Sequence, residues 1–300
     1  MAATKDYIDL LQPDIIGTIR GLSLISKVVV DKYLSGLNVS RRKGSGMEFS
    51  QYRGYEPGDD LRLLDWKMLA RSGKYFIKQS EVDTHTTIKF IIDASASMMH
   101  TEAALSKLSY VQVLVASLAY LAKSQGDAIG LYAMNESKTF HLSPSSQSQQ
   151  FNRFLQQLIS VNAEGKWPVR SAAASAIHSR KEREMIVVFT DLYETKDELS
   201  SYIASLKTPR NEVIVIHVLG EQEFKFNYKG TLVFEDLESG EQVKVASGKA
   251  KELYLQALDE KVKKHQQHFL TQAVSYEQFM MGQPIENVLS AYLKRRLKFA

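Results

Sequence analysis

The 300-residue sequence contains no cysteine, which excludes disulfide bonds and thiolate chemistry and fits a reducing cytoplasm. It also lacks a long hydrophobic run, because its longest apolar segment, residues 110–122, is interrupted by Gln112 and Ser117. That segment is too short to span a bilayer. The first residues carry charges and form no apolar stretch of the signal-peptide type. We therefore expect a cytoplasmic protein without an integral membrane segment.

A strong excess of one charge is missing as well. The formal net charge is +4 and 24% of the residues are charged, a balance too even to indicate nucleic-acid binding. Two short basic clusters, at residues 41–43 and 294–298, are not interleaved with aromatic residues as a base-stacking surface would be. With 44% hydrophobic residues, the chain can bury a substantial core. We expect a globular protein that does not bind nucleic acid.

The signature motifs of several enzyme classes are also absent. The sequence has no Gly-x-Ser-x-Gly elbow, no Gly-x-x-x-x-Gly-Lys-Ser/Thr phosphate loop and no His-Glu-x-x-His zinc helix. These absences argue against serine hydrolases of the elbow type, P-loop nucleotidases and zinc proteases.

Alternating strand and helix patterns begin at residue 86. Strands are expected at 86–93, 128–134, 185–191 and 212–219, and helices at 103–124, 148–160, 170–179 and 196–206. Such alternation predicts a doubly wound α/β fold, in which helices cover both faces of a mostly parallel sheet. A hairpin insertion is expected near 221–247, followed by a helix at 248–271, a strand at 274–277 and a helix at 284–298.

Residues 1–85 have a different character, and we expect them to pack on a main domain formed by residues 86–300. Their pattern predicts an N-terminal helix at 14–34 and a short β segment, with strands at 49–55 and 74–81 around a turn and a short helix. Charged residues of both signs lie close to the aromatic Trp66 in this segment. They are Arg53, Asp59, Asp60, Arg62, Asp65 and Arg71. Either these charges pair with one another and fix the segment in place, which we favour, or they bind a partner directly.

An Asp-x-Ser-x-Ser loop follows the first strand of the main domain, with Asp93, Ser95 and Ser97 as its polar residues. Functional loops of open α/β sheets lie where parallel strands end. Magnesium prefers oxygen ligands and is often held by one or two carboxylates, which leaves a position for a partner's carboxylate. Alternatively, the three residues only cap the next helix. Because Asp191 ends another buried strand, it can reach the same edge of the sheet and favours the metal site.

The Asp93 loop together with Asp191 resembles the metal-ion-dependent adhesion site (MIDAS) of von Willebrand factor A domains, in which the later Asp usually reaches the metal through water. The segments 49–62, 64–67 and 70–74, the Asp93 loop and the acidic turn at 234–241 resemble a bacterial family labelled domain of unknown function fifty-eight (DUF58). Its members contain a von Willebrand factor A-like domain and are typically encoded beside MoxR-type AAA+ ATPases. The resemblance implies a von Willebrand factor A-like fold and a protein-binding role.

One ligand of the adhesion site is missing from this sequence. The family uses a Thr from an intervening loop, but no Thr lies between Thr139 and Thr190. The resemblance therefore implies Mg²⁺ held weakly or not at all. Lys166 or Arg170 is then a candidate to supply positive charge where a cation would lie.

Taken together, these features predict a non-enzymatic interaction module that binds a protein partner at the Asp93 edge. The resemblance implies that the partner is a MoxR-type AAA+ ATPase or its client, with an adaptor role in chaperone-like maturation or complex assembly. The alternative is a magnesium-dependent phosphoryl hydrolase using Asp93 and Asp191. Haloacid-dehalogenase phosphatases, however, require a second acidic residue two positions after the first, where this chain has Ser95. A third possibility is a structural scaffold whose site is empty.

Overall fold

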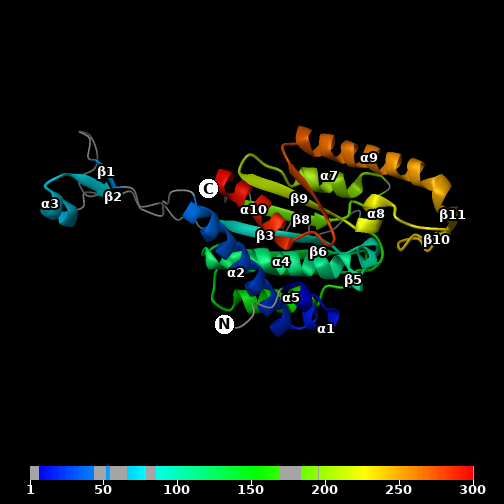
Figure 1. The fold of residues 1–300 in the computed structure, drawn as a ribbon, viewed down its shortest axis with the longest axis horizontal. Coiled ribbons are helices and arrows are strands. Elements are labelled where there is room, and N and C mark those ends of the chain that lie inside the picture. The colour runs from blue at the N-terminus through cyan, green and yellow to red at the C-terminus, as the bar shows by residue number, and fades with distance from the viewer. Residues whose placement is uncertain are drawn as a thin grey trace. The chain divides into compact units, whose positions relative to one another are not determined.

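The computed structural model describes residues 7–43, 52–54, 66–78, 86–168, 184–194 and 196–299. The chain divides into two compact units, one formed by residues 1–33 and 85–300 and the other by residues 34–84. The first, here called the main unit, carries the large sheet and the candidate site (Figure 1).

A six-stranded sheet forms the centre of the main unit. Its strands, in spatial order, are β12 (Ser275–Met280), β9 (Asn211–Leu219), β8 (Glu184–Thr190), β3 (Thr87–Asp93), β6 (Ala128–Met134) and β7 (Thr139–Ser145). All neighbours are parallel except β6 and β7, which are antiparallel. The mostly parallel sheet of the sequence prediction is confirmed, whereas β7 was not predicted because its polar sequence lacks the pattern of a buried strand.

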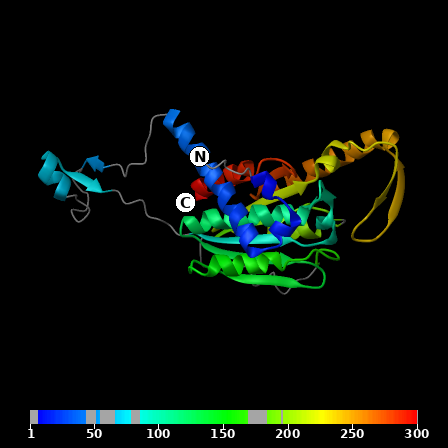
Figure 2. The same ribbon diagram turned by 60° about the horizontal axis from the view of Figure 1, so that its bottom comes forward.

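Helices cover both faces of the sheet (Figures 1 and 2). Alternate β3 residues separate two apolar clusters, with Phe90 and Ile92 on one side and Ile91 on the other. The first cluster includes side chains of α4 (Lys107–Ser124), α5 (Gln150–Ile159) and α10 (Ile285–Phe299). The second includes side chains of α7 (Glu198–Ser205) and α9 (Ser247–Thr271). The predicted doubly wound α/β class is thus confirmed, while the helix expected at 170–179 lies outside the described residues.

The N-terminal helices belong to the main unit as far as Tyr33, and the division expected at residues 85 and 86 stays a prediction. After the short η1 (Tyr7–Leu10), they are α1 (Pro13–Ile16) and α2 (Ile19–Lys43). Their buried apolar residues Ile16, Leu22, Ile25 and Val29 join the cluster around α4. Burying these side chains favours their inclusion in the main unit, since each contributes about 1.5 to 3 kcal/mol.

The second unit contains the predicted short β segment. Its strands β1 (Tyr52–Gly54) and β2 (Phe76–Lys78) are antiparallel, and α3 (Trp66–Ser72) lies between them in the sequence. Asp59, Asp60, Arg62 and Asp65 of the mixed-charge motif lie outside the described residues. The two interpretations of that motif, ion pairing and partner binding, therefore stay predictions.

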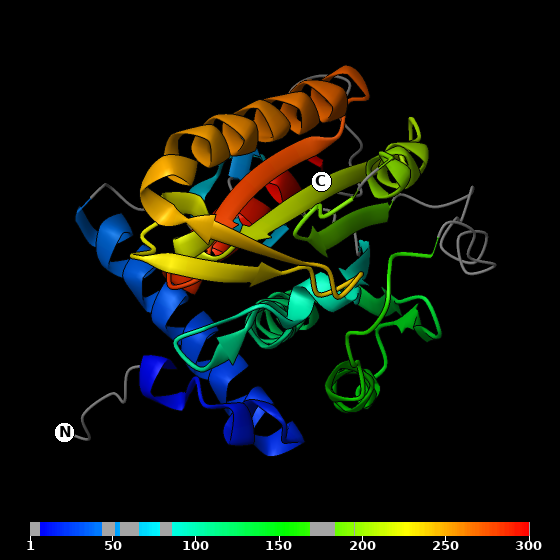
Figure 3. The same cartoon turned by 90° about the vertical axis from the view of Figure 1, so that its right-hand side faces the viewer.

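Short elements surround the carboxyl edge of the sheet. The Asp93 loop leads into η3 (Ala96–Met99) and the small hairpin of β4 (Thr101–Glu102) and β5 (Leu105–Ser106). The predicted insertion near 221–247 consists of α8 (Glu221–Lys225) and an antiparallel hairpin of β10 (Thr231–Glu235) and β11 (Gln242–Ala246). Figure 3 shows this hairpin leading directly into α9. Within the ranges described above, no helix is long and apolar enough to cross a membrane.

Candidate functional site at the carboxyl edge of the sheet

The parallel pairing of β3 and β8 brings Asp93 and Asp191 to the same edge of the sheet. Ile92 is the register partner of Phe189, so Asp93 lies beside Thr190 and Asp191 where the two strands end. Strand β3 lies between β6 and β8 and is almost entirely buried, which fixes the position of the loop that follows it. The structure therefore joins the residues that the sequence grouped as one site.

A chain of hydrogen bonds connects the four predicted site residues. The hydroxyl oxygens of Ser95 and Ser97 lie 3.0 Å apart, and Ser97 Oγ donates to Asp191 Oδ1 at 3.0 Å. Asp93 Oδ1 accepts from the Ser95 N–H at 3.0 Å, and Asp93 Oδ2 accepts from Thr190 Oγ1 at 2.7 Å. Asp93 is 0% exposed and Asp191 is 6% exposed. Thr190 is thus a site residue that the sequence prediction treated only as the end of a strand.

The alternative role of the loop, capping the next helix, does not match these contacts. Ser95 precedes η3 but its side chain makes no capping hydrogen bond. The cap of α4 is Ser106, whose hydroxyl accepts from the Ser109 N–H at 3.1 Å. The loop's side chains are therefore directed to one another and to Asp191.

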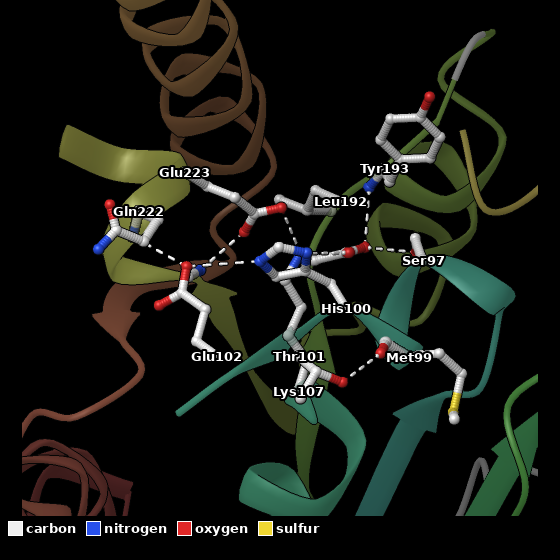
Figure 4. A network of polar contacts seen from close by, with 12 residues as sticks. Ser97, Met99, His100, Thr101, Glu102, Lys107, Leu192, Tyr193, Gln222 and Glu223 are labelled. Carbon is white, nitrogen blue, oxygen red and sulfur yellow. Dashed lines mark hydrogen bonds and ion pairs between the residues drawn. The ribbon is translucent and has the colours of Figure 1, made fainter. Parts of the chain in front are cut away.

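Lys107, the first residue of α4, supplies the positive charge at this site. Its Nζ lies 2.8 Å from Asp191 Oδ2 and 3.0 Å from Glu223 Oε1, and its side chain is 3% exposed. Figure 4 shows Lys107 and Glu223 together in this network. A buried ammonium group is tolerated when it is paired and hydrogen-bonded. Lys107 was not predicted from the sequence. Its place between the candidate loop and a long apolar helix could have indicated a buried lysine close to the site.

Lys166, which the sequence singled out as a source of positive charge, is exposed. Its backbone N–H donates to Glu136 Oε2 at 3.2 Å. The ammonium group in contact with Asp191 is that of Lys107. Arg170, the other candidate, lies outside the described residues.

Helix α8 holds Glu223 in this network. Glu223 Oε2 accepts from the N–H of Gly220, the N-cap residue of α8, at 2.7 Å. Glu102 of β4 accepts from the N–H groups of Glu221 and Gln222 at 2.7 and 2.8 Å (Figure 4). Carboxylates at a helix N-terminus satisfy otherwise unpaired N–H groups. These contacts fix α8 against β4 and so fix the second carboxylate beside Lys107.

The two central carboxyl groups differ in pKa. Burial, together with the negative charge of Asp191, raises the pKa of Asp93 to about 6. Burial opposes ionisation of Asp191 too, but the adjacent Lys107 ammonium overcomes that effect and lowers the Asp191 pKa. The same edge of the sheet therefore holds Asp191, which ionises readily, and Asp93, which resists ionisation.

His217 supports the backbone behind Asp191. Burial lowers the His217 pKa to about 3, so the ring is neutral near pH 7. Its Nε2 lies 3.0 Å from the Asp191 carbonyl oxygen, and its Nδ1 lies 2.5 Å from the Tyr276 hydroxyl. Because a carbonyl oxygen only accepts, Nε2 carries the proton and Nδ1 accepts from Tyr276. Neither residue was identified from the sequence.

Residues 164 and 165 lie alongside the Asp93 loop, in the segment where the family's Thr is missing. The Glu164 N–H donates to the Ala94 carbonyl at 3.0 Å, and the Ala96 N–H donates to the Gly165 carbonyl at 2.8 Å. Gly165 has a φ of +60°, a conformation that glycine adopts without strain. These backbone contacts hold the Asp93 loop in place.

Replacing Gly165 with alanine is expected to lower the free energy of unfolding by about 1 to 2 kcal/mol, because an L-residue at positive φ is strained. The added Cβ would also lie 2.5 Å from Glu136 Oε2, a side chain that has to move. Gly248→Ala is the matched control, since an added Cβ there meets nothing within 4 Å and φ is not positive. Urea unfolding of both variants measures the difference, and equal stabilities would contradict the strain.

The hydroxyl and carboxylate oxygens of the site are of the ligand types that a magnesium ion prefers. The separations of 3.0 Å from Ser95 Oγ to Ser97 Oγ and from Ser97 Oγ to Asp191 Oδ1 match those of adjacent ligands in an octahedron with bonds of about 2.1 Å. Glu238 Oε1 is buried without a hydrogen-bond partner among the described residues. No group of three or more His, Asp and Glu residues in the described ranges is arranged to hold a metal. A cation here would therefore depend on hydroxyl oxygens as well as carboxylates.

A family model and curated relatives match most of the chain. The model of the family described as "Protein of unknown function DUF58" matches residues 51–268. Uncharacterized protein Rv1480 of Mycobacterium tuberculosis is 26% identical over 236 residues, which cover 77% of this chain and 74% of the relative. Uncharacterized protein Mb1516 of Mycobacterium bovis matches with the same identity and coverage.

Solved structures also resemble the chain. The conserved hypothetical protein BatB from Bacteroides thetaiotaomicron has a TM-score of 0.48 and 15% identity, over 71% of this chain and 99% of that one. The VWA domain of SpRpn10 has a TM-score of 0.40 and 13% identity, over 69% of this chain and 95% of that one. At these identities and scores, no site residue takes its role from those structures.

Proposed function

Since the chain belongs to the family described as Protein of unknown function DUF58, we propose that it is a non-enzymatic protein-interaction module whose Asp93 edge docks a partner's carboxylate. The observation that carries the proposal is a buried polar centre with exposed apolar side chains close to it in the chain. Met99 and Tyr193 are 48% and 45% exposed, and they follow the site residues Ser97 and Asp191 by two positions. Figure 4 shows Met99 and Tyr193 near Ser97. Apolar side chains with polar groups between them are typical of protein interfaces.

Magnesium is the cofactor that the donor set supports. When bound, the ion would supply positive charge for a partner's carboxylate, and Asp93, Ser95, Ser97 and Asp191 would hold it. Lys107 competes with the ion, because it already pairs with Asp191 Oδ2. We therefore propose weak binding that depends on the partner.

The family resemblance supports a MoxR-type AAA+ ATPase, or a client of one, as the partner. The protein would then act as an adaptor in chaperone-like maturation or in the assembly of a complex. A docking edge on a rigid sheet suits this role, because contacts mounted on fixed strands keep their geometry.

Pull-down from the native cell tests the docking edge. Wild type is expected to capture a partner that Asp93→Asn does not capture. Asp259→Asn is the matched control, because Asp259 lies on the exposed face of α9 and pairs only with Lys263 among the contacts described. Equal capture by Asp93→Asn and wild type would contradict the proposal.

The phosphoryl-hydrolase alternative is not favoured by the geometry. A carboxylate nucleophile has to reach the phosphorus atom, but Asp93 is fully buried and both of its oxygens accept hydrogen bonds within the protein. Asp191 is paired with Lys107. We expect no magnesium-dependent turnover of a generic phosphate ester, and turnover that is lost in Asp93→Ala would establish the alternative.

A further inference from the structure

The hydrogen bonds at both ends of the β10–β11 hairpin show which backbone groups of β10 point toward β11. The Ser247 N–H donates to the Gly230 carbonyl at 3.0 Å, just before β10 begins. The Asp236 N–H donates to the Glu241 carbonyl at 2.9 Å, just after β10 ends. Hydrogen-bonded and non-hydrogen-bonded residue pairs alternate along an antiparallel ladder. The even-numbered residues of β10 therefore bond to β11, and the odd-numbered residues direct their N–H and C=O groups away from it.

The outward-pointing residues of β10, here called the β10 edge, are Thr231, Val233 and Glu235. All three are exposed, and the Val233 side chain is 59% exposed. In the described part of the chain, β10 pairs with no strand other than β11. Strand β11 lies on the side of the hairpin nearer α9, and β10 lies on the other side (Figure 3). A row of unpaired, regularly spaced donors and acceptors is a template for one further strand.

Features that prevent strand pairing occur at other strands of this chain but not at β10. Lysines, prolines and irregular registers are the usual protection of an exposed edge. Strand β7, at one side of the large sheet, contains Pro144 and an irregular register with β6. Strand β11 carries Lys244 at an outward-pointing position. Strand β10 has no lysine and no proline, and its register is regular.

Contacts of the neighbouring residues hold the β10 edge in place. The Phe234 ring centroid lies 6.0 Å from that of Phe226 and 5.3 Å from that of Tyr228. Asp236, directly after the strand, accepts from the Tyr193 hydroxyl at 3.0 Å. A strand that is already ordered loses little conformational freedom when it pairs, so more of the interaction energy contributes to affinity.

We propose that the β10 edge binds an extended segment of a partner protein, which joins the hairpin as an antiparallel third strand. Backbone hydrogen bonds supply the contact, and side chains across the strands select the sequence. Glu235 accepts from the Gln242 amide at 3.1 Å and forms no ion pair within the described residues. Apolar pairs and opposite charges stabilise neighbouring strands. The preferred segment therefore carries Val or Ile opposite Val233 and, two positions earlier, Lys or Arg opposite Glu235.

This inference goes beyond the proposed function, because strand addition requires neither a cation nor the Asp93 edge. It is tested with a peptide, so its outcome does not depend on whether that edge docks a carboxylate.

The probe is the capped peptide Ser-Lys-Thr-Val-Gln-Thr-Ser, whose Lys and Val have the required spacing. Titration of the isotope-labelled full chain with this peptide, followed by NMR, is expected to shift the amide signals of Thr231, Val233 and Glu235. The signals of Leu232 and Phe234 are expected to move less, since their N–H groups bond to β11.

Methylated peptides test the backbone contact without changing the protein. N-methylation of the peptide's valine removes an N–H that points to the β10 edge and is expected to weaken binding at least tenfold. N-methylation of the following glutamine is the matched control, because that N–H points away from β10. It is expected to leave binding within about twofold of the unmodified peptide.

Val233→Pro and Lys244→Pro form a matched pair of variants, because the two residues are register partners and each directs its N–H away from the other strand. Val233→Pro removes a donor from the β10 edge and is expected to weaken peptide binding at least tenfold. Lys244→Pro removes a donor from the opposite edge and is expected to bind like wild type.

Equal binding by Val233→Pro and wild type would overturn the proposal. Equal shifts at all five β10 amides, or a wild-type protein whose signals do not move with the peptide, would overturn it too. Shifts of the same amide signals when the protein alone is concentrated would identify a second copy of the chain as the occupant, which also contradicts the proposal.

Discussion

Replacing Lys107 with methionine is expected to lower the free energy of unfolding by about 3 to 5 kcal/mol, the cost of leaving one member of a buried ion pair alone. Methionine keeps the length and apolar stem of lysine, so the change removes mainly the charge. Asp191 Oδ2 and Glu223 Oε1 would lose their contacts of 2.8 and 3.0 Å. The Asp191 side chain is 2% exposed, so water cannot replace the ammonium group. Urea unfolding at pH 7 measures the difference.

Two further variants separate the buried pair from a general effect of removing a lysine. Lys107→Met combined with Asp191→Asn is expected to recover much of the lost stability, because the uncompensated charge is gone. Lys225→Met is the exposed control, since its partner Glu221 is also about half exposed. That pair contributes about 0.3 to 0.5 kcal/mol at most. A loss below about 1 kcal/mol in Lys107→Met would contradict the role of Lys107 as counter-charge.

Replacing Asp93 with asparagine is expected to have the opposite effect and to raise the free energy of unfolding at pH 8 by about 3 kcal/mol in a chelating buffer. The pKa of Asp93 is about 6 in the folded protein against an ordinary value of 3.8. The folded state therefore binds this proton more tightly than the unfolded state. The resulting stability is present below about pH 4 and is lost as the pH rises through 6. Asparagine has no such loss.

The difference between the two stability curves isolates Asp93 from other titrating groups. The His217 pKa is lowered to about 3, so protonation of the unfolded state reduces wild-type stability as the pH falls below about 6.5. This effect is opposite in sign to that of Asp93 between about pH 4 and 6, but it is present in both proteins. The advantage of Asp93→Asn is expected to grow from pH 4 to pH 7. Stability–pH curves that run parallel for the two proteins would contradict the raised pKa of Asp93. A variant less stable than wild type at pH 8 would contradict it as well.

The sequence was sufficient to predict the parallel sheet and two of its acidic residues. Strands such as Phe90 to Ile92 are continuous apolar runs, and an Asp directly after such a run has to lie at the sheet edge. Strand β7 was not predicted, because an antiparallel edge strand can be polar. The buried side chains of α1 and the first part of α2 place them in the main unit, which periodicity alone did not indicate.

The contacts that define the electrostatics of the site could not be predicted from the sequence. Lys107 and Asp191 are 84 residues apart in the chain, and Glu102 and Gln222 are 120 apart. The turn of the insertion was predicted, but the hydrogen bond from Tyr193 to Asp236, which links that turn to the segment after β8, was not. Tertiary packing, not local propensity, decides each of these contacts.

The most direct test of the docking edge is a binding titration of a purified MoxR-type ATPase, the partner proposed above, against wild type and Asp93→Asn. The titration is performed at pH 8 with magnesium, where the variant is expected to be at least as stable as wild type. Loss of stability could not then explain loss of binding. We predict that wild type binds and that Asp93→Asn binds at least tenfold more weakly, as expected for loss of a site carboxylate. Equal affinities for the two proteins would contradict the assignment of the Asp93 edge as the docking site.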